Sequence, residues 1–353
     1  MPDTMPEGQS QKIQWTILRE NRAQDVLSLV LAIEEADRAP YRSDLGEVEE
    51  FFSDVWITRL FGGRAPNGEL IAFGLVRMPA THGETVEISL WGGIHPEWRN
   101  RGLGRELVGM QVRAGREIAS ESGVREASLV MHVDEGHDDL TDLLNRDGFV
   151  TKQSYVQMRR SLKEPVVVPD ASAFISLVPL TEEFDAQVRV AHNAIHLENA
   201  GASAISAQQW QAERAYMERN WSFAALDTLG DRPRLAGYII SGRYEQDWQA
   251  RGWSEGYIDE IAIYDEARRK RLLRALLGKA MQAYQRDGID YAGIDIPVQV
   301  GAEEPDIDFF MSLGFEITGR TFIYSKSLDL TSSPVRKVVQ AQGRRRIFRA
   351  SGR

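Results

Sequence analysis

Residues 86–110 of the chain read VEISLWGGIHPEWRNRGLGRELVGM, and the interpretation of the whole sequence starts from this stretch. Residues up to Ile94 predict a strand, with apolar and polar residues alternating from Val86 to Leu90, and a helical pattern follows Leu103. Between them, Gly102 and Gly104 stand at alternate positions of a short turn. A helix start leaves backbone N–H groups without intrahelical partners and carries a partial positive charge. Because glycine has no side chain to block approach, this turn predicts a place where phosphate oxygens bind backbone amides.

Arginines surround the same turn, since Arg99, Arg101 and Arg105 flank the two glycines. The turn is not a Walker A loop, because no Gly-Lys-Ser/Thr follows, and it lacks the third glycine of a dinucleotide-binding fingerprint. A purely structural alternative stays open, in which the glycines form a tight turn and the arginines face solvent.

With both nucleotide motifs excluded, Arg99, Gly102 and Gly104 fill a pattern that resembles the R/Q-x-x-G-x-G/A loop of the GNAT superfamily of acyl-CoA-dependent N-acyltransferases. The resemblance implies that this loop binds the pyrophosphate of acetyl-CoA, which would be the co-substrate. It also implies that the fourth and fifth strands separate and that the pantetheine arm enters the gap and pairs with the fourth strand. The cofactor-binding residues that it implies are Trp91, Gly92, Gly93, Ile94, Arg99, Asn100, Arg101, Gly102, Leu103, Gly104 and Arg105.

Composition indicates a soluble globular protein, with 353 residues, 42% hydrophobic and 27% charged. The length favours two domains. There is no cysteine, which excludes disulfides and makes a zinc site improbable, so we expect no metal. The N-terminus has no apolar targeting segment, and no run reaches membrane-spanning length, so a cytoplasmic enzyme without membrane association is expected.

The net charge is −10, although residues 333–353 carry seven arginines and lysines and no acid. We interpret 331–353 as a basic tail and 1–11 as a flexible N-terminus. The acidic remainder argues against specific nucleic-acid binding and favours a cationic substrate. The sequence leaves a homodimer open.

An internal repeat appears at a spacing of about 170 residues. Residues 257–281 (YIDEIAIYDEARRKRLLRALLGKAM) echo residues 86–110, and 313–328 echo 147–162. The proline-bearing segment 163–173 separates the copies and predicts a linker. The expected organisation is an N-terminal domain at 12–162, which binds acetyl-CoA, and a C-terminal domain at 174–330.

Within the first copy we expect strands near 13–19, 55–63, 69–79, 85–95, 126–133 and 150–161, and helices near 22–36, 43–53, 101–122 and 138–147. This order predicts an α/β chain with a mixed sheet. It is similar to the GNAT fold, so the resemblance implies two tandem GNAT domains. The duplication is similar to that of mycothiol synthases, where the intact loop lies in the C-terminal copy instead.

The second copy has lost the glycines. Aligning Arg99 with Arg269 places Leu272 opposite Gly102 and Arg274 opposite Gly104. A branched side chain and a long cation at these places would block the close approach of phosphate oxygens. We therefore expect a degenerate coenzyme A loop in the C-terminal domain, which would support the first domain or contact the acceptor.

The resemblance implies a general base on the fourth strand, at Glu87, where apolar neighbours would raise the carboxyl pKa. His132 and His95 are alternatives, because a histidine accepts a proton near neutral pH. Glycines 92 and 93 could allow a bulge there. The family's usual tyrosine acid is replaced by Leu144, so the source of the proton for the thiolate stays open.

The acid-rich loop 134–139 (DEGHDD) precedes a predicted helix. Helix capping is the favoured interpretation, with binding of an amine as the alternative. Taken together, the expected function is transfer of an acetyl group from acetyl-CoA to a primary amine of a small molecule, such as an aminoglycoside-like metabolite. The alternatives are a protein N-acetyltransferase and a non-catalytic module that senses acyl-CoA.

Overall fold

The structure is a computed structural model that describes residues 13–171, 173–196, 204–264, 269–299 and 305–330. The predicted N-terminus 1–11 and basic tail 331–353 lie outside these residues. In the first half the elements agree with the sequence prediction to within a few residues. They are β1 (Gln14–Ile17), α1 (Ala23–Ala36), α2 (Leu45–Glu50), β2 (Trp56–Arg64), β3 (Leu70–Pro79), β4 (Thr85–Ile94), α3 (Leu103–Ser122), β5 (Glu126–Asp134), α4 (Asp138–Arg146) and β6 (Val150–Ser161).

The second half repeats this order of elements, with one additional helix, α7, between its third and fourth strands. It contains β7 (Ile175–Pro179), α5 (Asp185–His196), α6 (Ala207–Ala212), β8 (Phe223–Asp227), β9 (Arg234–Gly242), α7 (Glu245–Arg251), β10 (Glu255–Ile263), α8 (Arg269–Arg286), β11 (Tyr291–Gln299), α9 (Pro305–Ser312) and β12 (Glu316–Leu328). None of the helices in the described ranges is long and apolar enough to cross a membrane.

All twelve of these strands form one mixed sheet, in the order β1-β2-β3-β4-β5-β12-β6-β11-β10-β9-β8-β7. Two neighbouring pairs are parallel, β4 with β5 and β10 with β11, one in each half. The helix after the first strand of each parallel pair, α3 or α8, supplies the crossover that a parallel connection requires. The predicted α/β chain with a mixed sheet is thus confirmed.

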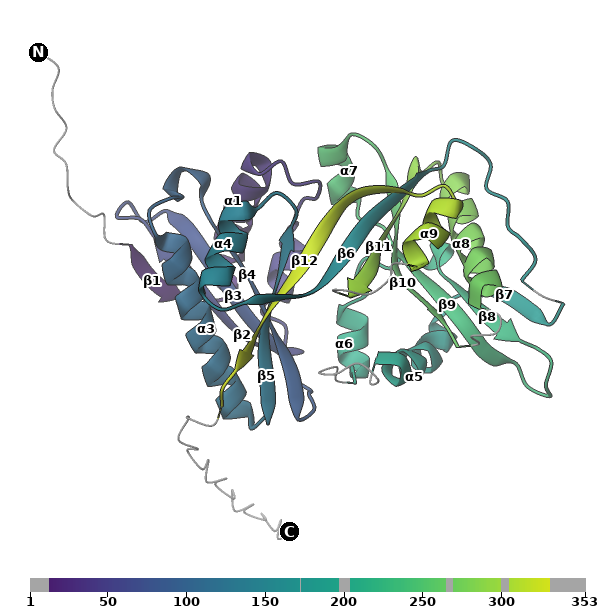
Figure 1. Cartoon of the computed structure of the whole chain (residues 1–353), viewed down its shortest axis with the longest axis horizontal. Helices are drawn as coiled ribbons and strands as arrows, with labels where there is room; N and C mark the ends of the chain where they lie inside the picture. The colour runs from purple at the N-terminus through teal and green to yellow at the C-terminus, as the bar shows by residue number, and fades with distance from the viewer. Residues whose placement is uncertain (1–12, 172, 197–203, 265–268, 300–304, 331–353) are drawn as a thin grey trace, which may run out of the picture.

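The last strand of each half is exchanged with the other half. β12, from the C-terminal end of the chain, lies between β5 and β6, and β6 pairs with β11 on its other side. Figure 1 shows these two long strands running side by side across the middle of the molecule. A cut at 163–173 would remove β6 from both of its neighbours. The predicted domain boundaries therefore do not divide the molecule into two independent sheets. Separating the two domains would break the hydrogen-bonded ladders of β6 and β12.

Helices cover both faces of the first half. One face of β2 and β3, with Leu60 and Phe73, packs against Val26 and Val30 of α1 and Val48 of α2. On the opposite face, β4 and β5 pack against α3 and α4 through a second apolar cluster. That cluster includes Ile88, Val108, Ile118, Leu129 and Leu144.

Side chains join the halves beyond the shared sheet. Tyr216 donates a hydrogen bond to Oδ2 of Asp44 at 2.8 Å, and the amide of Gln246 donates to Oε1 of Glu47 at 3.0 Å. The predicted linker lies along α8, where Gln285 donates to the carbonyl oxygens of Leu162 and Glu164. The second half is therefore fixed against the region that carries α1 and α2.

Candidate active site

Strands β4 and β5 separate toward their carboxyl ends. Their parallel ladder runs from Thr85–Glu126 to Ser89–Val130 and stops there, whereas the strands continue to Ile94 and Asp134. The separation leaves one edge of β4 without a strand partner over residues 90–94. This is the splaying that the family resemblance implied.

The separated strands open into a cleft of about 1070 Å³ that continues to the start of α3. Apart from Arg101, every residue predicted to bind the cofactor lines this cleft. The far wall comes from β5 and α4, including His132, Asp134, Leu140 and Leu143. The structure thus brings the sequence-predicted residues together in one place, while their role in binding remains a prediction.

The turn before α3 exposes its backbone to the cleft. Gly102 has φ +83° and Asn100 has φ +61°, both in the left-handed region. A side chain at Gly102 would therefore be strained, and a Cβ at Gly104 would meet only Leu143, at 3.4 Å. The glycines keep the first turn of α3 open on the cleft side. Its amides and its positive end are in the arrangement that binds anions.

Glycines 92 and 93 serve close packing. The register between β3 and β4 continues through both residues without a shift, so the bulge considered there is wrong. A Cβ at Gly92 would lie 2.5 Å from the carbonyl oxygen of Phe73, and one at Gly93 would lie 2.6 Å from Cδ1 of Ile33. Small residues are needed here because β3 and α1 approach the strand directly.

The three predicted arginines differ in their surroundings. Arg99 forms a two-pronged ion pair with Asp37, the residue that follows α1, and donates to the carbonyl oxygen of Ile94. Arg101 stacks over Trp98, with its Cζ 4.7 Å from the ring centroid, and donates to the carbonyl of Glu97. Arg105 lines the cleft in the first turn of α3. Arg99 therefore contributes by fixing the loop, and Arg105 is placed to face an anion.

Glu87 lies on β4 but does not line the cleft. Its carboxylate pairs with the Lys152 ammonium of β6, and both side chains are partly exposed. The expected burial against apolar neighbours is not found, because Glu87 pairs with Lys152 and the buried residues Val86, Ile88 and Leu90 of β4 point to the opposite face. Its assignment as general base stays a prediction.

His132 stands on the same face of the sheet and lines the cleft. Burial lowers the pKa of its imidazole, against the opposing pull of Asp134 and Glu87. The other alternative, His95, accepts a hydrogen bond from the backbone N–H of Glu97 and does not line the cleft. Leu144, at the family's tyrosine position, is completely buried in the core.

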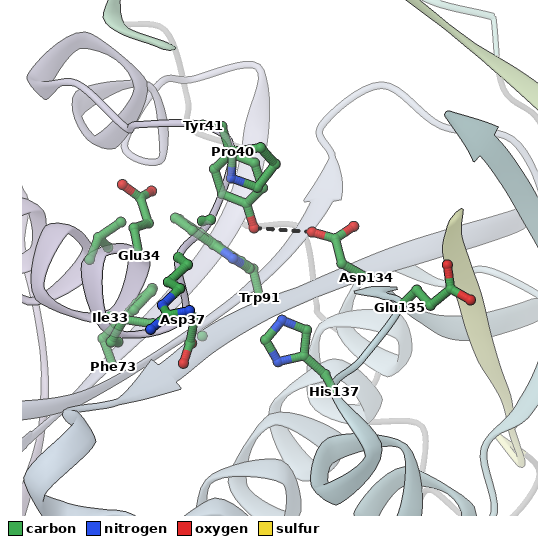
Figure 2. A pocket seen from close by; sticks show the side chains of 14 residues that line it. Ile33, Glu34, Asp37, Pro40, Tyr41, Phe73, Trp91, Asp134, Glu135 and His137 are labelled. Carbon is green, nitrogen blue, oxygen red and sulfur yellow. Dashed lines mark hydrogen bonds between the residues drawn. The ribbon is translucent and has the colours of Figure 1, made fainter. Parts of the chain in front are cut away.

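A smaller cavity of about 210 Å³ adjoins the cleft at Trp91, Gly92 and Asp134. Figure 2 shows Tyr41 and Asp134 meeting across it, with their hydrogen bond from Tyr41 Oη to Asp134 Oδ2 at 3.3 Å. Phe73 and Trp91 form apolar walls, and Glu34, Asp37 and Glu135 bring further carboxylates. No sequence pattern pointed to Tyr41, which reaches the cavity from the segment between α1 and α2.

The acidic loop 134–139 does not cap α4 through its side chains. The N-cap residue is His137, which makes no side-chain capping bond, and Asp134 and Glu135 line the two cavities instead. The favoured capping interpretation is therefore wrong for these two residues. Among the described residues, no three histidine, aspartate or glutamate side chains gather closely enough to hold a metal ion.

In the second half, the residues opposite the two glycines are structural. Leu272 is completely buried in the core of that half, and Cζ of Arg274 lies 5.4 Å from the ring centroid of Phe309. These positions do not test the expected loss of the coenzyme A loop in this half, which stays a prediction. Residues 265–268, which precede α8, lie outside the described residues.

No family model matches the chain, and no curated protein matches it in sequence. Solved structures do match. A GCN5-related N-acetyltransferase from Sphaerobacter thermophilus has TM-score 0.65 and 17% identity, over 92% of this chain and 97% of that one. A tandem GNAT protein from the clavulanic acid biosynthesis pathway has TM-score 0.66 and 15% identity, over 90% and 98%. The N-myristoyltransferase of Saccharomyces cerevisiae, with myristoyl-CoA bound, has TM-score 0.58 and 12% identity, over 93% and 82%. The chain therefore has the fold of the GNAT acyltransferases, duplicated in tandem.

Proposed function

We propose that the protein is an N-acetyltransferase that moves an acetyl group from acetyl-CoA to a primary amine of a small molecule. The observation that carries this proposal is the cleft between β4 and β5, which ends at the glycine turn before α3. One end offers backbone amides and a positive helix terminus for a diphosphate. The other end meets a small cavity with carboxylates.

Different residues of the cleft would bind different parts of the coenzyme. The amides around Gly102 and Gly104 and the guanidinium of Arg105 would hold the diphosphate. The free edge of β4 at residues 90–94 would pair with the pantetheine amides like an added strand. A backbone N–H of that edge would then polarise the thioester carbonyl.

The transfer needs a neutral amine, whose nitrogen attacks the thioester carbon. The C–N bond forms, the C–S bond breaks, and the nitrogen gives up a proton. His132 is the proposed acceptor of that proton, because it lines the cleft and its lowered pKa keeps the imidazole neutral near pH 7. Glu87 is proposed to act indirectly, because its negative charge raises the pKa of His132. The thiolate takes a proton from water, since Leu144 has none to give.

The size of the acceptor end favours a small molecule. A cavity of about 210 Å³ holds one amine-bearing group and its neighbouring atoms, and its walls come from α1, β4 and β5. A protein N-acetyltransferase and a non-catalytic acyl-CoA sensor are the alternatives. Thiol release with a panel of spermidine, glucosamine, kanamycin and tyramine distinguishes an enzyme from a sensor. An acetylated protein product without small-molecule turnover would support the protein acetyltransferase instead.

The coenzyme site is tested by Gly104→Glu, which places a carboxylate in the cleft beside the start of α3. We expect acetyl-CoA binding to be lost in calorimetry. Gly109→Glu is the matched control, because Gly109 lies on the same helix and a Cβ there meets only the end of Arg113, at 3.6 Å. Equal acetyl-CoA affinity in the two variants would overturn the site.

A further inference from the structure

Asp134 lies where the coenzyme cleft and the small cavity meet, and it lines both. Two hydroxyl groups hold its carboxylate. Tyr41 donates to Oδ2 at 3.3 Å and Thr321 donates to Oδ1 at 2.7 Å. The amide of Gln157 in turn donates to the hydroxyl of Thr321 at 2.9 Å. The carboxylate is thereby fixed in orientation.

These contacts join three separate parts of the chain. Tyr41 comes from the segment after α1, Asp134 ends β5, and Thr321 belongs to β12, the exchanged strand of the second half. Thr321 is directly opposite Asp134 in the β5–β12 ladder, and its side chain is mostly buried. The exchange of strands therefore delivers a second-half residue to the acceptor end of the first-half site.

Of the other carboxylates of the small cavity, Glu135 is exposed, and the remaining two are held by partners of their own. Asp37 is neutralised by Arg99, and Glu34 accepts bonds from the backbone and the hydroxyl of Ser43. Arg38, the cation of the lining, is exposed at the rim. The hydrogen-bond partners of Asp134 are neutral hydroxyls, which orient its charge without cancelling it. A half-buried carboxylate that is oriented but not neutralised attracts a cation.

We propose that Asp134 binds the ammonium group of a cationic acceptor and that Thr321 positions it for this task. The proposal rests on the proposed function and names its substrate as an amine that is charged before transfer. Asp134 forms no covalent bond and takes no proton. The bound ammonium gives one proton to solvent before it attacks, and the nitrogen gives the second to His132 as the C–N bond forms.

The first test is binding of spermidine, glucosamine, kanamycin and tyramine by calorimetry, with coenzyme A present. Asp134→Asn keeps the shape of the side chain and removes its charge. Loss of a charged hydrogen bond predicts that the Kd of the amine that binds best rises about 10- to 100-fold. Asp142→Asn, an exposed aspartate of α4, is the matched control and should leave that Kd unchanged. An unchanged Kd in Asp134→Asn, or no binding of any of the four amines to the wild type, would overturn the proposal.

The second test addresses positioning. Thr321→Val should raise the same Kd roughly 3- to 10-fold through the loss of one neutral hydrogen bond, and Thr321→Ser should restore it. Thr318→Val is the control on the same strand, since Thr318 is exposed and bonds only the backbone carbonyl of Gln157. A purely structural role would lower the melting temperature of Thr321→Val without changing the Kd. That outcome would remove Thr321 from the proposal.

The affinity for acetyl-CoA separates this inference from the proposed function. Asp134→Asn and Thr321→Val should bind acetyl-CoA as tightly as the wild type. If the wild type binds acetyl-CoA and acetylates an amine, but Asp134→Asn leaves the amine affinity unchanged, the ammonium site is wrong and the function stands. If the wild type does not bind acetyl-CoA, the proposed function itself fails.

Discussion

Arg99 and Asp37 are joined by two parallel hydrogen bonds, Nη1 to Oδ1 at 2.5 Å and Nη2 to Oδ2 at 2.8 Å. This two-pronged geometry gives an ion pair both strength and orientation. It ties the turn before α3 to the end of α1, which also walls the small cavity. The loop that faces the diphosphate is therefore held by a first-half helix through Arg99, whose guanidinium is engaged before any ligand arrives.

This pair predicts non-additive effects on coenzyme binding. Arg99→Ala and Asp37→Ala should each raise the Kd of acetyl-CoA about 5- to 10-fold, because either change releases the same loop. The double variant should be no weaker than the weaker single variant. Calorimetry of the four proteins measures the coupling. Additive effects would show that Arg99 contacts the coenzyme independently of Asp37.

The neighbouring glycines of β4 predict unequal responses to alanine. At Gly92 the new methyl would meet the backbone oxygen of Phe73, which belongs to the β3 ladder and cannot move away. At Gly93 it would meet the flexible end of Ile33. We expect Gly92→Ala to cost about 1–3 kcal/mol of unfolding free energy and Gly93→Ala clearly less. Urea denaturation measures both, and an equal loss would contradict the packing argument.

The sequence predicted the elements well because their signals are local. The strand pattern of residues 86–94 and the helical pattern after Leu103 can be read within a short window, and the structure confirms both elements. The glycine turn was found because its two glycines have a defined spacing. The separation of β4 and β5 was predicted only from the family resemblance, because no sequence pattern within either strand indicates where their ladder ends.

The exchange of β6 and β12 could not be read from the sequence. A strand pattern shows which face is buried, but it does not name the neighbouring strand, and β12 pairs with β5 across about 190 residues of chain. Thr321 was missed for that reason, and Tyr41 was missed because it lies between α1 and α2, outside any helix or strand pattern. Asp134 was seen but misjudged, because the local rule for helix capping was applied to a residue whose partners are distant in sequence.

The pKa of His132 predicts how kcat/KM depends on pH under acidic conditions, where the fall in kcat/KM forms the acidic limb of the pH profile. Burial lowers this pKa below its ordinary value of 6.5, so kcat/KM should fall only as the pH drops below that value and the imidazole gains a proton. Asp134 and Glu87 both pull the pKa upward. Asp134→Asn and Glu87→Gln should therefore move the acidic limb to still lower pH.

Replacing the imidazole tests the assignment directly. His132→Gln should remove the acidic limb and lower kcat about 10²- to 10⁴-fold, the usual contribution of a positioned base. His82→Gln, on the loop before β4, is the control, because the ring of His82 contacts only the carbonyl of the next residue. If the activity of His132→Gln still falls at acidic pH, another group is the general base, and Glu87 is the first candidate.

The contact between the halves predicts a pH-dependent stability. Glu47 of α2 accepts a hydrogen bond from Gln246 of α7, and burial, followed by repulsion from Asp44, raises its pKa to about 7. The ordinary value is 4.5. A raised carboxyl pKa means that the folded state holds the proton more tightly than the unfolded state. The stabilisation from protonated Glu47 is complete below pH 4.5 and is lost as the pH rises through 7.

Glu47→Gln keeps the side-chain shape and removes this dependence. Relative to the wild type, the variant should gain about 1–3 kcal/mol of unfolding free energy between pH 5 and pH 8, since it carries no charge to bury at the higher pH. Urea denaturation at both pH values measures the change. Glu49→Gln, exposed on the same helix, should follow the wild type. If Glu47→Gln and Glu49→Gln respond alike to pH, the carboxyl of Glu47 is ionised in the folded protein at pH 5, and the two halves meet there across a solvated charge.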